Sequence, residues 1–134
     1  MCINIWAADV EGYCEVEMDN TIQSLYDVIL QRKEHGEEGS YTAYLFEQGV
    51  DKILKKIGEE ATEVVIASKN LELASETDPV KRDELKNEIC DLIYHLLVLM
   101  AKQDIPLEEI QTVLESRSLK TGNLKKQKVV DKNT

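Results

Sequence analysis

Two segments of the chain, residues 50–70 and 80–102, combine helical periodicity with acidic side chains. In the second segment, apolar residues surround the expected helix on nearly every side, which is typical of a buried helix. Its ionisable residues nevertheless line up within about 60° of one another on a helical wheel of about 100° per residue. They are Glu84, Glu88, Asp91 and His95. Burying an ionised carboxylate costs several kcal/mol unless it is paired or bound to a cation, so this segment predicts a charged site within the fold.

The first segment carries an EExxE pattern, made by Glu59, Glu60 and Glu63. On the helical wheel, the two outer glutamates share an arc of about 60° with Lys52 and Lys56, whereas Glu60 lies on the flank. Apolar residues cover the opposite side. Taken alone, this pattern is typical of an amphipathic helix with a solvated charged face, and that interpretation is favoured for this helix by itself.

The second segment changes the interpretation of the first. Two acidic stripes on neighbouring helices repel each other strongly at low dielectric, and Lys86 and Lys102 lie near the ends of the second segment, too far away to neutralise it. A divalent cation between the helices would remove the repulsion. Because the candidate ligands are carboxylate oxygens, without a cysteine or histidine cluster, the pattern predicts a hard ion, Mg²⁺ or Mn²⁺.

A resemblance to a known family is carried by two runs, SYTAYLFEQGVDKILKKIGEEATEVVIASKN at residues 40–70 and EICDLIYHLLVLMA at residues 88–101. Both are similar to the phosphoribosyl-ATP pyrophosphatases of histidine biosynthesis, which belong to the all-α (MazG-like) NTP pyrophosphatases. That superfamily shares EExxE, a gap and ExxD, and here Glu88 and Asp91 form the second pattern after a gap from Val64 to Asn87. The flanking residues make the resemblance specific to the one family, and it covers about residues 22–126.

The resemblance implies Mg²⁺-dependent hydrolysis of phosphoribosyl-ATP to phosphoribosyl-AMP and pyrophosphate, the second step of histidine biosynthesis. It also implies a homodimer with active sites close to the subunit interface. The family's metal-ligand positions fall on Glu59, Glu60, Glu63, Glu88 and Asp91. Glu60 and Glu63 are the catalytic candidates. For Glu60 two roles stay open, a ligand acting through water or the base that takes a proton from the attacking water.

Further residues are candidates for substrate binding. They are Lys52, Lys55, Lys56, Ser40, Tyr41, Thr42 and His95. The lysines precede the acidic motif by one or two turns and suit phosphate contacts, with ion pairs to glutamates along the helix as the alternative. The Ser-Tyr-Thr triplet matches the family's SYT stretch. The histidine follows Asp91 by one turn, and its alternative role is that of a hydrogen-bonded core residue.

The chain as a whole predicts an all-α fold, a bundle of about four to five helices that is completed by dimerisation. We divide it into an acidic N-terminal arm (residues 1–20), a helical domain (21–119) and a basic C-terminal tail (120–134). Besides the two long helices, shorter ones are expected over residues 20–33, 43–48 and 107–119. The first is expected to be capped by Asp19 or Asn20, the second by Ser40 or Thr42. Gly58 indicates a close helix contact, a ligand approach or a tolerated glycine.

Composition narrows the function classes. The 134 residues, 43% of them hydrophobic, are enough for one core, and the net charge of −10 argues against a nucleic-acid surface. No run of 18 apolar residues predicts a membrane span, and the acidic start does not resemble a secretory signal, so we expect a cytoplasmic protein. Cys2, Cys14 and Cys90 suggest neither a disulfide framework nor a zinc site, and Cys90 is expected in the core.

Two other functions stay open on the sequence. One is a housecleaning pyrophosphatase of the same superfamily that acts on dUTP or a damaged nucleotide. The metal motif does not distinguish this function from hydrolysis of phosphoribosyl-ATP. The other is a non-catalytic helical dimerisation module, in which the acidic faces are merely solvated.

Overall fold

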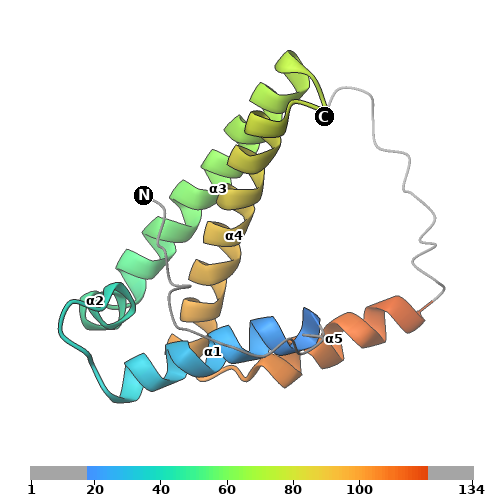
Figure 1. Cartoon of the computed structure of the whole chain (residues 1–134). Helices are drawn as coiled ribbons and strands as arrows, with labels where there is room; N and C mark the ends of the chain where they lie inside the picture. The colour runs from blue at the N-terminus through green and yellow to red at the C-terminus, as the bar shows by residue number, and fades with distance from the viewer. Residues whose placement is uncertain (1–17, 121–134) are drawn as a thin grey trace, which may run out of the picture. The chain divides into compact units, whose positions relative to one another are not determined.

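The computed structural model describes residues 18–120, and within this range the chain forms five α-helices and no strand (Figure 1). The predicted all-α fold is therefore confirmed. The helices are α1 (Met18–Glu34), α2 (Tyr41–Gln48), α3 (Val50–Ala74), α4 (Pro79–Lys102) and α5 (Leu107–Leu119). The chain divides into two compact units, one ending at Asp104 and one beginning at Ile105. Nearly all of the predicted arm and tail lie outside the described residues.

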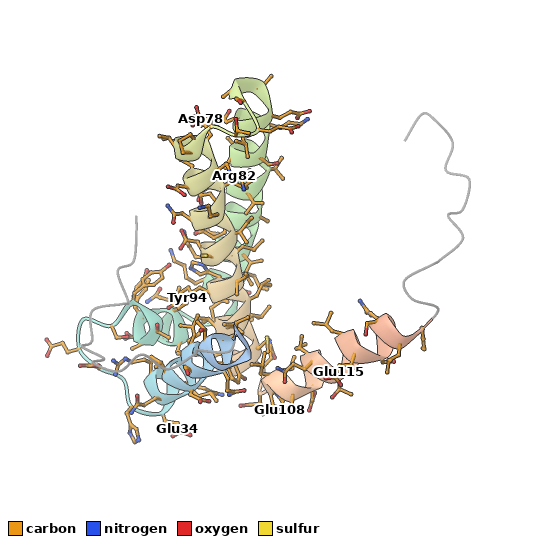
Figure 2. All side chains as sticks on the ribbon, turned by 45° about the vertical axis from the view of Figure 1, so that its right-hand side comes forward. Glu34, Asp78, Arg82, Tyr94, Glu108 and Glu115 are labelled. Carbon is orange, nitrogen blue, oxygen red and sulfur yellow. The ribbon has the colours of Figure 1, made fainter. Side chains whose placement is uncertain are left out.

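The first unit is built on a long antiparallel hairpin of α3 and α4 (Figure 1). Helix α3 continues four residues beyond its predicted end at residue 70. The segment that connects α3 to α4 is therefore only a short turn at residues 75–78. Asp78 caps α4, because its carboxylate accepts a hydrogen bond from the Lys81 amide at 3.0 Å. Pro79 follows at the first helical position, where its missing N–H costs nothing. Figure 2 shows Asp78 and Arg82 at this tip of the hairpin.

Helix α3 packs on α4 through residues seven apart, Ile53, Glu60 and Ala67, which are its buried positions. Seven residues are close to two helical turns, so these three side chains form one stripe. Glu60 therefore lies at the helix contact, which agrees with its expected place on the flank of the charged arc, next to the apolar side.

Helices α1 and α2 pack at the open end of the hairpin, opposite the tip (Figure 1). The largest fully buried side chains there come from all four helices: Ile29, Leu45, Ile53 and Val98. Lys33 of α1 closes the C-terminus of α4, since its ammonium donates to the Ala101 carbonyl at 2.8 Å and pairs with Asp104 at 2.6 Å. A cation at this position adds a donor to a carbonyl of the last helical turn and offsets the negative end of the helix dipole.

The loop between α1 and α2 and the joint before α3 set the direction of α2. Ser40 is the helix cap, with its hydroxyl accepting from the Ala43 amide at 3.2 Å. Gly49 joins α2 to α3 with φ of +89°, a conformation that L-residues rarely adopt. Helix α1 begins at Met18, before both predicted capping residues, so neither Asp19 nor Asn20 stands at its start.

Helix α4 is less covered than predicted. Ile89, Ile93 and Leu96 are each about 40% exposed and follow an i, i+4, i+7 pattern along one face. Cys90 is also exposed, so its predicted place in the core is wrong. The all-round apolar character of α4 thus reflects two faces, one packed on α1–α3 and one left without a partner in the described part of this unit.

The second unit contributes the described helix α5. Its bounds agree with the prediction, with Pro106 at the N-cap position. Glu108 and Glu109 in the first turn and Arg117 in the last turn match the two ends of the helix dipole. None of the helices between residues 18 and 120 combines the length and apolar character that crossing a bilayer requires.

Candidate metal centre

Three carboxylates meet where the middle of α3 faces the middle of α4. Glu60, Glu88 and Asp91 each offer one oxygen, and these oxygens all lie within 4.8 Å of one another. Glu60 comes from the first acidic pattern and the other two from the second, so the hairpin brings together the two halves of the motif. Residues i and i+3 on α4 lie on the same helix face, which is why Glu88 and Asp91 reach one point. We call these three residues the acidic cluster.

Glu60 is the buried member of the acidic cluster, with only 5% of its surface exposed. Burial by itself would raise the pKa of this carboxyl, but two hydrogen bonds outweigh it and lower the pKa. One comes from Lys56, whose ammonium lies 2.9 Å from a Glu60 oxygen, and the other from Glu63. Glu60 therefore stays ionised inside the helix contact, as a metal ligand must.

Glu63 lies beside the acidic cluster on the solvent side of α3. Hydrogen bonds to the carboxylates of Glu60 and Glu88 raise its pKa to about 7, and the negative charges of both neighbours act in the same direction. Without a cation, four carboxylates are thus crowded into one place, and the most exposed of them holds a proton near neutral pH. Such crowding of carboxylates favours added positive charge at this place.

Asp91 shows the same shortage of positive charge. Its pKa is raised, first by burial and then by the negative charges of Glu60 and Glu88. Three carboxylates of this geometry, without a sulfur ligand, fit a hard divalent cation that prefers oxygen. The carboxylates of Glu60, Glu88 and Asp91 are therefore chemically suited to hold a divalent cation such as Mg²⁺ or Mn²⁺.

Glu59 does not join the acidic cluster, although the sequence predicted it as a metal ligand. Its carboxylate points along the surface of α3, where it pairs with Lys56 at 3.1 Å and with Lys55 at 3.8 Å. These two ion pairs lower the pKa of Glu59, the hydrogen bond from Lys56 most. The reason is geometric: α4 lies on the Glu60 side of the helix, so Glu59 is turned away from it.

The three candidate lysines have different surroundings. Lys56 is the one that reaches the acidic cluster, and its hydrogen bond to Glu60 raises its pKa, so it stays charged. Lys55 is largely exposed and pairs only with Glu59. Lys52 lies over the Tyr44 ring, with its ammonium 6.0 Å from the ring centroid. The alternative interpretation, ion pairs along the helix, thus describes Lys55 and part of the environment of Lys56.

Two neighbouring hydrogen bonds fasten the start of α2 to α4, just beyond Asp91. The Thr42 hydroxyl lies 2.5 Å from the Tyr94 hydroxyl, and the Tyr41 hydroxyl lies 3.3 Å from Nε2 of His95. Figure 2 shows Tyr94 at this junction. No local pattern in the sequence indicates these pairs, because each joins residues more than fifty positions apart.

His95 has its two ring nitrogens occupied by protein atoms. Nδ1 lies 2.7 Å from the Asp91 carbonyl, which can only accept, so Nδ1 carries the proton and Nε2 accepts from Tyr41. The side chain is 2% exposed. This arrangement argues against the predicted substrate contact and favours the alternative, a hydrogen-bonded core residue. The hydroxyls of Ser40 and Thr42 also have partners within the protein. Ser40 accepts from the Ala43 amide at the start of α2, and Thr42 bonds to the Tyr94 hydroxyl.

Comparisons with known proteins bear on what this centre does. A family model described as phosphoribosyl-ATP pyrophosphohydrolase matches residues 22–118. A phosphoribosyl-ATP pyrophosphatase of Clostridium novyi (strain NT) is 52% identical over 110 residues, which cover 81% of this chain and 92% of that protein. Proteins with the same name from Listeria welshimeri and Streptococcus sanguinis are 49% and 44% identical, each over 82% of this chain and 97% of the relative.

Proposed function

Because the chain belongs to the phosphoribosyl-ATP pyrophosphohydrolase family, we propose that it hydrolyses phosphoribosyl-ATP to phosphoribosyl-AMP and pyrophosphate, the second step of histidine biosynthesis. The relatives that carry this name cover most of the chain. The observation that carries the proposal is the convergence of Glu60, Glu88 and Asp91 from two separate helices. Such a carboxylate set is what a reaction on a polyphosphate requires, since the negative charge of the substrate must be neutralised.

The proposed cofactor is Mg²⁺, with Mn²⁺ as a substitute, held by the acidic cluster. When bound, a divalent ion neutralises phosphate charge and lowers the pKa of a coordinated water. Glu60 is the fixed ligand, because it is buried and oriented by Lys56 at 2.9 Å. Glu88 and Asp91 are half-buried and approach from the other helix, so that the ion would join the two legs of the hairpin.

Glu63 is the proposed general base. It touches two members of the acidic cluster, yet its carboxyl is more exposed than theirs, so it can accept a proton from an attacking water and release it to solvent. This assignment also decides the open role of Glu60, which becomes a ligand. Lys56 keeps its charge beside the cluster and is the proposed phosphate contact among the three candidate lysines.

We propose that the enzyme works as a homodimer. The support is the row Ile89, Ile93 and Leu96 on α4, together with the exposed Leu54 and Val65 of α3. Large apolar side chains that gather on the outside of a helical hairpin are typical of an interface between subunits. The sedimentation of the purified protein tests this assignment, and a monomer at micromolar concentration contradicts it.

The test of the function is pyrophosphate release from phosphoribosyl-ATP, measured with Mg²⁺ and with EDTA. We expect turnover only with the metal and a clear preference over dUTP and the common NTPs. Glu63→Gln should lose roughly 10²- to 10⁴-fold in kcat, which is the usual contribution of a general base. Asp83→Asn is the matched control, because Asp83 pairs with Lys86 on the surface of α4. Preference for a simple dNTP overturns the substrate, and equal rates for wild type and Glu63→Gln overturn the base.

A further inference from the structure

A cavity of about 290 Å³ lies between α1, the loop at residues 35–40 and the start of α2, and Tyr94 of α4 also lines it. Its lining includes the apolar Leu25 and Ile29 of α1 and an aromatic wall, by which we mean Tyr41 and Tyr94. The two tyrosine rings are nearly parallel, with 26° between their planes and 6.4 Å between their centroids. The volume is at the small end of pockets for small molecules, about 300–1,000 Å³. It suits one part of a nucleotide, such as a purine ring.

The aromatic wall connects this cavity to the acidic cluster. Tyr94 follows Asp91 by three residues on α4, which is about 4.5 Å along the helix axis. Tyr41 hydrogen-bonds to His95, which in turn contacts the Asp91 carbonyl. The charges of Lys56 and Glu60 both act on the pKa of Tyr41, which burial raises. A nucleotide with its phosphates at the acidic cluster therefore has its base within reach of the cavity.

The charges around the cavity suit a cation better than a phosphate. The charged residues that line it are Arg32, Glu37 and Glu38. Arg32 is already paired with Glu37, whereas within residues 18–120 no cation forms an ion pair with Glu38. The lining thus carries one uncompensated negative charge and two tyrosines. Aromatic faces and carboxylates both attract flat cations, and both disfavour the triphosphate.

We propose that this cavity binds the adenine of phosphoribosyl-ATP and selects the ring that carries a ribose on N1, through stacking on Tyr41 and the negative charge of Glu38. This inference rests on the proposed function. A substituent on N1 makes adenine a stronger base, so that the ring carries a positive charge that the adenine of ATP lacks near neutral pH. The cavity thereby distinguishes the substrate from ATP at the end of the molecule remote from the reacting phosphates.

The test compares two nucleotides that differ only at N1. The probes are α,β-methylene-ATP, whose bond between the α and β phosphorus atoms resists hydrolysis, and its N1-methyl derivative. Calorimetry with Mg²⁺ gives the ratio of their dissociation constants. We expect wild type to bind the methylated probe about fivefold more tightly, because an exposed ion pair and an exposed cation–π contact each contribute a few-fold at most.

Glu38→Gln keeps the shape of the side chain and should reduce the ratio to about twofold, as should Tyr41→Leu, whereas Tyr41→Phe keeps the ring and the ratio. Glu34→Gln is the matched control, because Glu34 is exposed and does not line the cavity. Equal affinity of wild type for the two probes overturns the proposal, as does a ratio that Glu38→Gln and Tyr41→Leu both leave unchanged.

Pyrophosphate release by wild type separates this inference from the proposed function. If the protein turns over phosphoribosyl-ATP but does not prefer the methylated probe, only the assignment of the cavity as the adenine site is refuted. If the protein prefers the methylated probe but does not turn over phosphoribosyl-ATP, the proposed reaction is refuted, whereas a binding site for a cationic purine is supported.

Discussion

Replacing Asp91 by Asn should stabilise the protein in EDTA and destabilise it relative to wild type in Mg²⁺. The reason is that the acidic cluster is unfavourable without a cation. Burial and the charges of Glu60 and Glu88 raise the pKa of Asp91, which shows that the folded chain resists its ionisation. The asparagine amide has nearly the same shape, removes one negative charge and can donate a hydrogen bond to a neighbouring carboxylate.

The expected size follows from the geometry. Two unit charges 4.8 Å apart, the upper limit for the oxygens of the cluster, repel by about 3.5 kcal/mol at an effective dielectric constant of about 20. Glu88 and Asp91 are only half-buried, and solvent screens them, so we expect a gain of about 1–2 kcal/mol in EDTA. A ligand at one hundred times its dissociation constant stabilises the folded state by about 2.7 kcal/mol. Wild type should gain this amount from Mg²⁺, and the variant should gain far less.

The assay is urea denaturation of both proteins in EDTA and in millimolar Mg²⁺. Their order of stability should reverse between the two conditions. Asp83→Asn serves as control, since its exposed ion pair with Lys86 predicts a change within about 0.5 kcal/mol in both buffers. If Asp91→Asn is less stable than wild type in EDTA, the carboxylates do not repel each other as argued. If it gains as much from Mg²⁺ as wild type, Asp91 is not a ligand.

Four further results are expected. Without metal, the free energy of unfolding should fall as pH rises from about 4.5 to about 7, because the raised pKa of Glu63 makes the folded chain bind more protons there than the unfolded one; urea titrations of Glu63→Gln should show a flatter profile. Tyr94→Phe should cost about 1–2 kcal/mol by leaving the buried Thr42 hydroxyl without its partner, against no effect for the exposed Tyr44→Phe. Gly58→Ala should raise stability by about 1 kcal/mol, since an added Cβ at this helical position meets open space; lost activity would instead show a ligand or partner there. Ile93→Glu should shift sedimentation from dimer to monomer while circular dichroism stays helical.

The sequence predicted the helices well because their signals are local. Ser40, Asp78 and Pro79 mark helix starts by capping and by the fixed φ of proline. The acidic residues of α4 were identified for a similarly local reason, since carboxylates inside an apolar run need compensation. Glu60, Glu88 and Asp91 do lie together, whereas their role as metal ligands stays a prediction.

What the sequence did not predict depends on which side of each helix meets its neighbour. Helical periodicity separates polar from apolar faces, but it does not reveal the position of α4 around α3. That position brings Glu60 to Glu88 and Asp91 and turns Glu59 away from them. The exposed row on α4 was taken for core because its apolar composition is that of a buried helix. The contacts of Tyr41 and Thr42 with α4 are set by the tertiary fold, and no spacing in the sequence encodes them.

The acidic cluster lies far from the turn at residues 75–78, so the hairpin of α3 and α4 can change in length near that turn without moving the carboxylates. Glu60 and Asp91 each lie between three and four helical turns, about 20 Å, from that turn. Inserting two turns into both legs at once would keep the same oxygens opposite one another, whereas one extra residue in a single leg would rotate its glutamate by about 100°. Paired insertions near the tip should therefore be tolerated, and unpaired ones should not.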